Sequence, residues 1–201
     1  MYRVSTELDV SDFLVDDQGR QAIAPDRSPG EQLFLREDEA GLSVGLFVDK
    51  AALARLAHRD PRARLDDDNL PDFLLALEGV SHFVYLATRA RVERRVSAVE
   101  LELQAEVDKW AVALLVCWDQ RGAPPSELRE RLFGRVHYLP DLSAEERSRY
   151  QLANEAANEY TGRLEARFVR RGKVEEMMGE LRRFYQEGLS GKLDRIARRA
   201  A

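Results

Sequence analysis

The chain lacks the residues and segments on which secreted and membrane-spanning proteins depend. Its 201 residues include a single cysteine, Cys117, which excludes an internal disulfide framework. The first ten residues, MYRVSTELDV, contain no apolar signal core. Charged residues interrupt the apolar runs before they reach spanning length, so we predict no transmembrane helix and no membrane association. These absences predict a protein of the reducing cytoplasm.

Sequence signatures of catalysis and cofactor binding are also missing. The chain has no phosphate-cradling glycine loop, no dinucleotide fingerprint, no Ser-His-Asp elbow and no Cys/His zinc spacing. We therefore expect no cofactor. The same absences favour a non-catalytic protein over an enzyme, although they do not decide the question.

Lysine is scarce and charge is unevenly distributed. The chain has 4 lysines among its 31 basic residues, and this arginine bias is typical of a GC-rich bacterial genome. Residues 161–201 carry 11 basic and 6 acidic side chains, a balance of +5, whereas the whole chain has a net charge of −5. Such asymmetry can mark a binding end, or it can be a solvated helical surface.

The apolar pattern changes its period near residue 50. Leu42, Val44, Leu46 and Val48 alternate with other residues, which is typical of a strand, and REDEAG separates them from QLFL as a hairpin loop would. Beyond residue 50 the spacing is helical. We predict a β-hairpin over 32–48, a possible short strand at DFLV, and helices over 49–58, 69–89, 97–118, 124–133, 143–171, 173–188 and 191–200.

The predicted fold is therefore mainly α: a multi-helix bundle with a small N-terminal β-hairpin as an α+β appendage. We expect one domain over 1–201, with an N-terminal segment at 1–49 and the helical bundle at 50–201. Capping boxes at SAVE and SAEE support helix starts at Ser97 and Ser143.

Two pairs of polar residues interrupt the central apolar helices. Glu78 and His82 are four residues apart, as are Glu102 and Glu106 on the next helix, so each pair shares one helical face. If the helices are antiparallel neighbours, the four side chains could form a metal site of the bundle type. We expect instead a structural pair, with Glu78 and His82 bonded either to each other or to the helix over 97–118, and no bound metal. The remaining alternative is a partly exposed pair at a recognition groove. Gly79 beside them indicates close approach of a neighbouring helix or a local bulge.

Arg131 and His137 stand in the segment RLFGRVH. Their spacing resembles the Arg-x4–6-His motif of HEPN ribonucleases, which are also helical bundles. The resemblance covers this motif alone, and Leu132 replaces the polar residue that the family usually has after the arginine. It implies a catalytic role in which the arginine holds a phosphate and the histidine transfers a proton.

The C-terminal helices carry a basic stripe that could bind a partner. We assign the partner-binding role to two groups of arginines. One side of the predicted helix over 143–171 carries Arg163, Arg167, Arg170 and Arg171, and the aromatic pair Phe184 and Tyr185 adjoins Arg182 and Arg183. Nucleic acid and an acidic protein surface are both compatible with such a stripe. Interleaved glutamates are also typical of a plain solvated face.

From these patterns we expect a non-catalytic bacterial cytosolic interaction protein, an adaptor or accessory subunit of a larger assembly, with a protein partner. The alternative is a nucleic-acid-binding protein or HEPN-like ribonuclease that uses Arg131, His137 and the basic C-terminal helices. Neither the partner nor the oligomeric state follows from the sequence.

Overall fold

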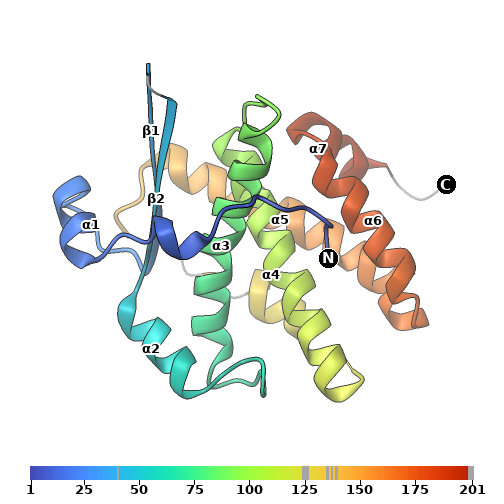
Figure 1. Cartoon of the computed structure of the whole chain (residues 1–201). Coiled ribbons are helices and arrows are strands. Elements are labelled where there is room, and N and C mark those ends of the chain that lie inside the picture. Colours follow the sequence, from blue (N-terminus) through green and yellow to red (C-terminus); the bar gives the residue numbers. More distant parts are fainter. Residues whose placement is uncertain (40, 124–126, 135, 137, 139, 199–201) are drawn as a thin grey trace.

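The computed structural model describes residues 1–39, 41–123, 127–134, 136, 138 and 140–198, and it confirms the mainly α fold class. A two-stranded antiparallel hairpin joins a bundle of α-helices (Figure 1). The described α-helices and strands are α1 Asp17–Ile23, β1 Glu31–Asp38, β2 Gly41–Val48, α2 Lys50–His58, α3 Leu70–Ala90, α4 Ala98–Arg121, α5 Ala144–Arg167, α6 Val174–Gln186 and α7 Leu189–Ala197. Of the predicted helix over 124–133, residues 124–126 lie outside the described residues, and Glu130–Gly134 form a π-helical turn.

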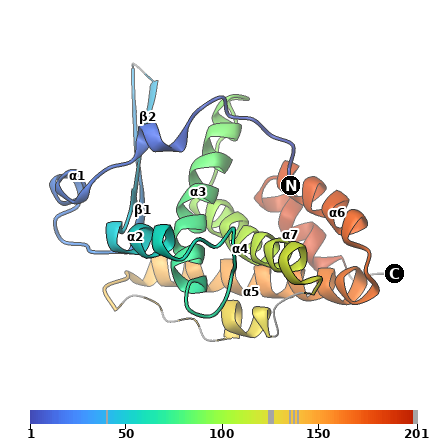
Figure 2. The same cartoon turned by 60° about the horizontal axis from the view of Figure 1, so that its bottom comes forward.

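The long helices α3, α4 and α5 form the centre of the molecule. Helix α4 packs against both α3 and α5. The hairpin and α2 pack on α3, and α7 packs on α5 and α6. The hairpin and the C-terminal helices therefore lie at opposite sides of the bundle, as Figures 1 and 2 show.

The helix starts have the local chemistry that the sequence predicts. The Ser97 side chain accepts a hydrogen bond from the Glu100 N–H, and Ser143 and Glu146 form a complete capping box. Helix α4 ends at Gly122, which adopts a left-handed conformation with φ 69°. Helix α5 is shorter than the predicted range of 143–171, because Val169–Arg171 form a separate 3-10 turn before Gly172.

The main core lies between α4 and α5. Leu103, Val107, Trp110 and Leu114 of α4 are buried. They face a group of buried α5 residues, namely Ala153, Ala157, Tyr160 and Leu164. A second, smaller cluster of Leu46, Val48 and Phe83 holds the hairpin against α3.

The N-terminal segment differs from the prediction in two places. Residues 17–23 form α1, a helix not predicted from the sequence, because Asp16 caps the helix by accepting from the Gly19 N–H. The DFLV segment is no strand: Val10–Phe13 form a 3-10 turn capped by Asp9. Only Leu14 makes a single parallel bridge, with Leu46.

Helix α3 is long and apolar enough, by length and composition, to cross a membrane, a test that core helices of soluble proteins also pass. In this fold it lies between the hairpin, α2 and α4. It also carries the buried polar residues Ser81, His82 and Arg89. We therefore interpret α3 as the central helix of the bundle.

Gly79 marks the point where the hairpin meets α3. A Cβ atom there would lie 2.9 Å from Glu31 Cγ and 2.9 Å from Leu46 Cδ1. Real Cβ contacts are almost never so short. The close approach expected from the sequence is present, but the neighbour is the hairpin and not a helix.

Candidate functional site

Seven ionisable side chains meet where β1, α3, α4 and α5 come together. We call them the charged centre; they are Glu31, Glu78, His82, Glu102, Glu106, Lys109 and Arg149. Their side chains are only 6% to 24% exposed. Burying so many charges costs free energy unless each charge is paired with one of opposite sign.

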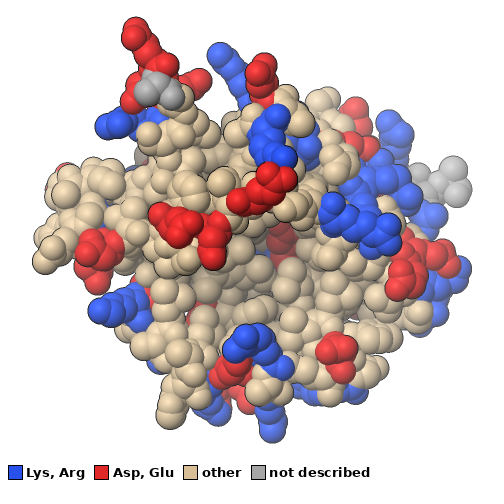
Figure 3. Space-filling view, viewed as in Figure 1, with Lys and Arg blue, Asp and Glu red and all other residues tan. Residues whose placement is uncertain are grey.

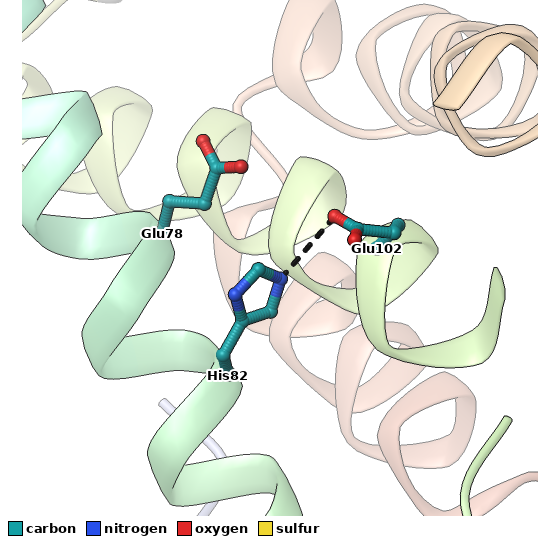
Figure 4. Close-up of side chains that lie close together, drawn as sticks. All are labelled: Glu78, His82 and Glu102. Atoms are coloured by element: carbon teal, nitrogen blue, oxygen red, sulfur yellow. Dashed lines mark ion pairs between the residues drawn. The ribbon is translucent and has the colours of Figure 1, made fainter. Parts of the chain in front are cut away.

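His82 lies between two carboxylates from different elements. Its Nδ1 is 3.4 Å from Glu31 Oε1 of β1, and its Nε2 is 3.4 Å from Glu102 Oε2 of α4 (Figure 4). The Nε2 contact is an ion pair without hydrogen-bond geometry, so this buried atom has no hydrogen-bond partner within the described structure. Burial lowers the pKa of the imidazole, but Glu102 and Glu31 outweigh burial and raise it to about 10.

Lys109 lies between the other two carboxylates. Its Nζ donates to Glu78 Oε2 at 2.9 Å and to Glu106 Oε1 at 2.8 Å. Burial opposes ionisation of Glu78, but the Lys109 ammonium outweighs it and lowers the Glu78 pKa. Burial raises the pKa of Glu106. Glu78 therefore bonds to α4 and not to His82, which is one of the two arrangements that the sequence left open.

Arg149 of α5 completes the centre. Its Nε is 3.9 Å from Glu102 Oε1, and its guanidinium lies 5.2 Å from the centroid of the Tyr150 ring. Burial raises the pKa of the Glu31 carboxyl. With all carboxylates ionised, four negative charges face Lys109, Arg149 and the His82 imidazolium, so the centre keeps one net negative charge.

Two pockets adjoin the charged centre. The larger, of about 530 Å³, is lined by residues that include Gln32, His82, Glu102 and Arg149. The smaller, of about 320 Å³, is lined by residues that include Glu78, Glu106, Lys109 and Asn154. Glu31 and Tyr150 line both pockets.

Several buried polar atoms at these pockets have no hydrogen-bond partner in the described ranges of the chain. In the larger pocket they are Gln32 Oε1, His82 Nε2 and Arg149 Nε, and in the smaller one Asn154 Nδ2. Buried polar groups are satisfied in most native structures, and exceptions often face a missing ligand, water or ion. Their concentration here favours a ligand site over a purely structural ion network.

Three residues of the centre can together hold a metal ion. Glu78, His82 and Glu102 each offer a ligand atom, and these atoms lie within 4.8 Å of one another (Figure 4). Glu106, the fourth residue of the predicted set, bonds to Lys109 instead. The sequence did not indicate Glu31 or Arg149, because neither shares a helical face with the two pairs.

A second buried polar network lies between α3, α4 and α7. Asp108 accepts hydrogen bonds from Ser81 at 2.5 Å, from Gln104 at 2.8 Å and from Tyr2. Lys192 is fully buried, donates to Gln104, and has its pKa lowered to about 7 by burial. These donors and acceptors satisfy one another, so we interpret this network as structural.

The other predicted site residues are dispersed. Arg131 forms an ion pair with Asp67 at 2.5 Å, and its proposed partner His137 lies outside the described residues. Among the C-terminal arginines, Arg170 contacts Glu165, Arg182 donates to the Met1 carbonyl, and Arg183 bonds to Glu180. Basic and acidic side chains alternate over the α6 and α7 side of the surface (Figure 3).

Arg163, Arg167 and Arg171 are the exception, because they line one pocket together with Arg195 and Arg198.

Comparison of the chain with protein-family models, curated proteins and solved structures finds no match. Its function must therefore be argued from the geometry of its own sites.

Proposed function

We propose that this chain is a cytoplasmic bacterial protein that binds a divalent transition-metal ion at the charged centre, through Glu78, His82 and Glu102. The proposal revises the sequence-based expectation of no metal. It rests on one observation: the buried Nε2 of His82 lacks a hydrogen-bond partner among the described residues and lies close to ligand atoms of both glutamates. Ligands about 2.1 Å from an ion stand about 3.4 Å apart in a tetrahedral site. The three ligand atoms lie within 4.8 Å of one another, so binding an ion would draw them closer together by side-chain rotation.

The contact between Glu31 and His82 supports this role. Metal-binding histidines usually donate their second ring N–H to a carboxylate, which fixes the tautomer and the orientation of the ring. Here Nδ1 lies 3.4 Å from Glu31 Oε1, which directs Nε2 toward Glu102. Lys109 orients Glu78 in a comparable way from α4.

The charge of the centre also favours a divalent ion. A divalent ion that replaces the His82 proton adds two positive charges, while loss of the proton removes one. The net charge of the centre then rises from −1 to zero, with Lys109 and Arg149 retained. Mixed imidazole and carboxylate ligands suit manganese, iron or zinc. Because His82 and Glu102 line the larger pocket, a small molecule in that pocket could reach the ion.

Metal titration of the full chain tests this function. We expect Mn²⁺ and Zn²⁺, each added alone to chelator-treated protein in a calorimeter, to bind at one ion per chain. Glu102→Gln should weaken binding by more than about 100-fold, and Glu31→Gln by about 10–100-fold, because Glu31 orients the ligand His82 without touching the ion. His58→Gln is the matched control, since His58 is exposed. Unchanged affinity in Glu102→Gln, or no binding at all, would contradict the proposal.

A protein-interaction role is the second candidate, and the hairpin favours it. Its outer half is exposed, with Leu35 50% and Leu42 43% exposed, and its tip extends away from the bundle (Figures 1 and 2). Within the described residues the sheet has only two strands, so β1 has an unpaired edge. Such an edge can accept an extended peptide strand from a partner.

Replacing both exposed leucines tests the interaction role. Leu35→Lys combined with Leu42→Lys places charge on the hairpin without touching the core. We expect this variant to lose a partner that wild-type protein recovers from the native host, while its thermal midpoint stays the same. Leu152→Lys is the control, because Leu152 is 45% exposed on α5. Recovery of the same partners by all three proteins would exclude the hairpin as the contact.

A further inference from the structure

A pocket of about 710 Å³ lies beside the C-terminal end of α5, and arginines dominate its wall. We call it the arginine pocket. Among the described residues its arginines are Arg163, Arg167, Arg171, Arg195 and Arg198, and its one acidic lining residue is Glu180. It shares no lining residue with the two pockets at the charged centre.

Only part of this positive charge is neutralised within the described structure. Arg195 pairs with Glu180 at 2.9 Å and also with Glu187. Arg163 donates to the backbone carbonyls of Arg198 at 3.0 Å and Arg195 at 3.2 Å. These contacts hold Arg163 and Arg195 in place at the wall.

The remaining arginines have no acidic partner among the described residues. Arg167 lies 5.1 Å from the centroid of the Phe168 ring. Neither Arg167, Arg171 nor Arg198 forms an ion pair with a carboxylate of the described residues. Three uncompensated guanidinium groups around one pocket repel one another, and an anion would offset that repulsion.

A buried tyrosine provides an independent sign of a ligand. Tyr160 is only 2% exposed and lines the pocket, and its hydroxyl has no hydrogen-bond partner in the part of the chain that the structure describes. Its ring is stacked on Phe184 with centroids 4.1 Å apart, which fixes its position. Arg163 Nε, also at the wall, is buried and finds no hydrogen-bond partner among the same described residues. Leaving such donors unsatisfied costs free energy that a bound acceptor would recover.

The helix dipole explains some of these features but not all. Cations are favourable near the C-terminal end of a helix, which accounts for Arg167 and Arg171. It does not account for an unpaired tyrosine hydroxyl buried beside them.

We propose that the arginine pocket binds a phosphoryl group, with Tyr160 and Arg163 as buried donors and Arg167 and Arg171 as the ionic partners. A phosphoryl group fits better than a single carboxylate, because it offers more charge and more acceptor oxygens to forked guanidinium donors.

The phosphoryl group can belong to a free small molecule or to a nucleic-acid backbone. Calorimetry of the full, metal-free chain with inorganic pyrophosphate tests the shared chemistry, and anisotropy of a labelled 12-nucleotide single-stranded RNA tests the second source. We expect one pyrophosphate per chain. RNA binding that pyrophosphate displaces, with affinity that falls steeply with salt, assigns the group to nucleic acid. Pyrophosphate binding without RNA binding assigns it to a small molecule.

Variants make the inference falsifiable. Arg167→Gln combined with Arg171→Gln should weaken pyrophosphate binding at least tenfold, and Tyr160→Phe about threefold to tenfold. The control is Arg59→Gln combined with Arg62→Gln, which removes the same charge from exposed arginines outside the pocket. Thermal midpoints show that each variant folds. Equal affinity in all variants, or no binding of either probe at low salt, overturns the proposal.

Discussion

Replacing His82 with alanine is expected to lower the free energy of unfolding by about 3 kcal/mol, at the lower end of the cost of breaking a buried ion pair. The imidazole contacts Glu31 and Glu102, and both carboxylates are nearly buried. Without the imidazolium ring, the Glu31 and Glu102 carboxylates face each other and those of Glu78 and Glu106, and fewer positive charges offset their repulsion. The larger pocket lets some water reach Glu102, which keeps the loss from being greater.

Urea denaturation in buffer with a chelator measures this effect. Because no metal is then present, the loss reports on the ion network alone. His58→Ala is the matched control: His58 is exposed on the last turn of α2, so its removal should change stability by less than about 0.5 kcal/mol. A His82→Ala protein as stable as wild type would show that the imidazole is not needed to hold the centre together. Loss of metal binding in that stable variant would then make His82 a purely functional residue.

Much of the fold follows from local sequence patterns. The change from period two to period 3.6 located the hairpin and the long helices, and serines at 97 and 143 cap their helices as their motifs predict. Helix α1 was missed because Asp16, Asp17 and Gly19 are common turn residues. The same Asp16 is also a good N-cap, and the local sequence does not decide between the two structures.

The charged centre was only partly predictable. Spacing by four residues placed Glu78 with His82 and Glu102 with Glu106, because periodicity determines which residues share a helical face. Glu31 is 51 residues from His82 in sequence, and no local pattern states which residue of a strand will face a given helix. The partner of Glu78 was likewise undetermined, since Lys109 is a surface-type residue that becomes buried only when the helices pack.

The basic stripe shows a different limit. A continuous helix over 143–171 predicts Arg163, Arg167, Arg170 and Arg171 on one side. The α-helix ends at Arg167, however, and a 3-10 turn follows over 169–171. Its tighter spacing changes the side-chain directions, so Arg170 contacts Glu165 while Arg171 lines the arginine pocket.

Replacing Gly79 with leucine is expected to destabilise the protein by about 3 kcal/mol, the upper end for overpacking a core. Even the Cβ atom would lie 2.9 Å from Glu31 Cγ and Leu46 Cδ1, and a longer side chain must displace the hairpin. Hydrogen exchange should then increase across β1 and β2 while α4 and α5 stay protected, because the small cluster that holds the hairpin is lost.

Gly179→Leu in α6 is the control for the glycine replacement itself. A Cβ there meets only Arg183 Nη1, at 3.8 Å, so helix propensity should dominate and stability should stay level or rise by up to about 1 kcal/mol. Similar losses of stability in both variants would mean that packing of the hairpin does not require glycine at 79.

If the stabilities of the two variants differ as expected, Gly79→Leu should also weaken metal binding, because displacing Glu31 removes the carboxylate that orients His82. A single glycine would then connect the hairpin's position on α3 to the chemistry of the charged centre.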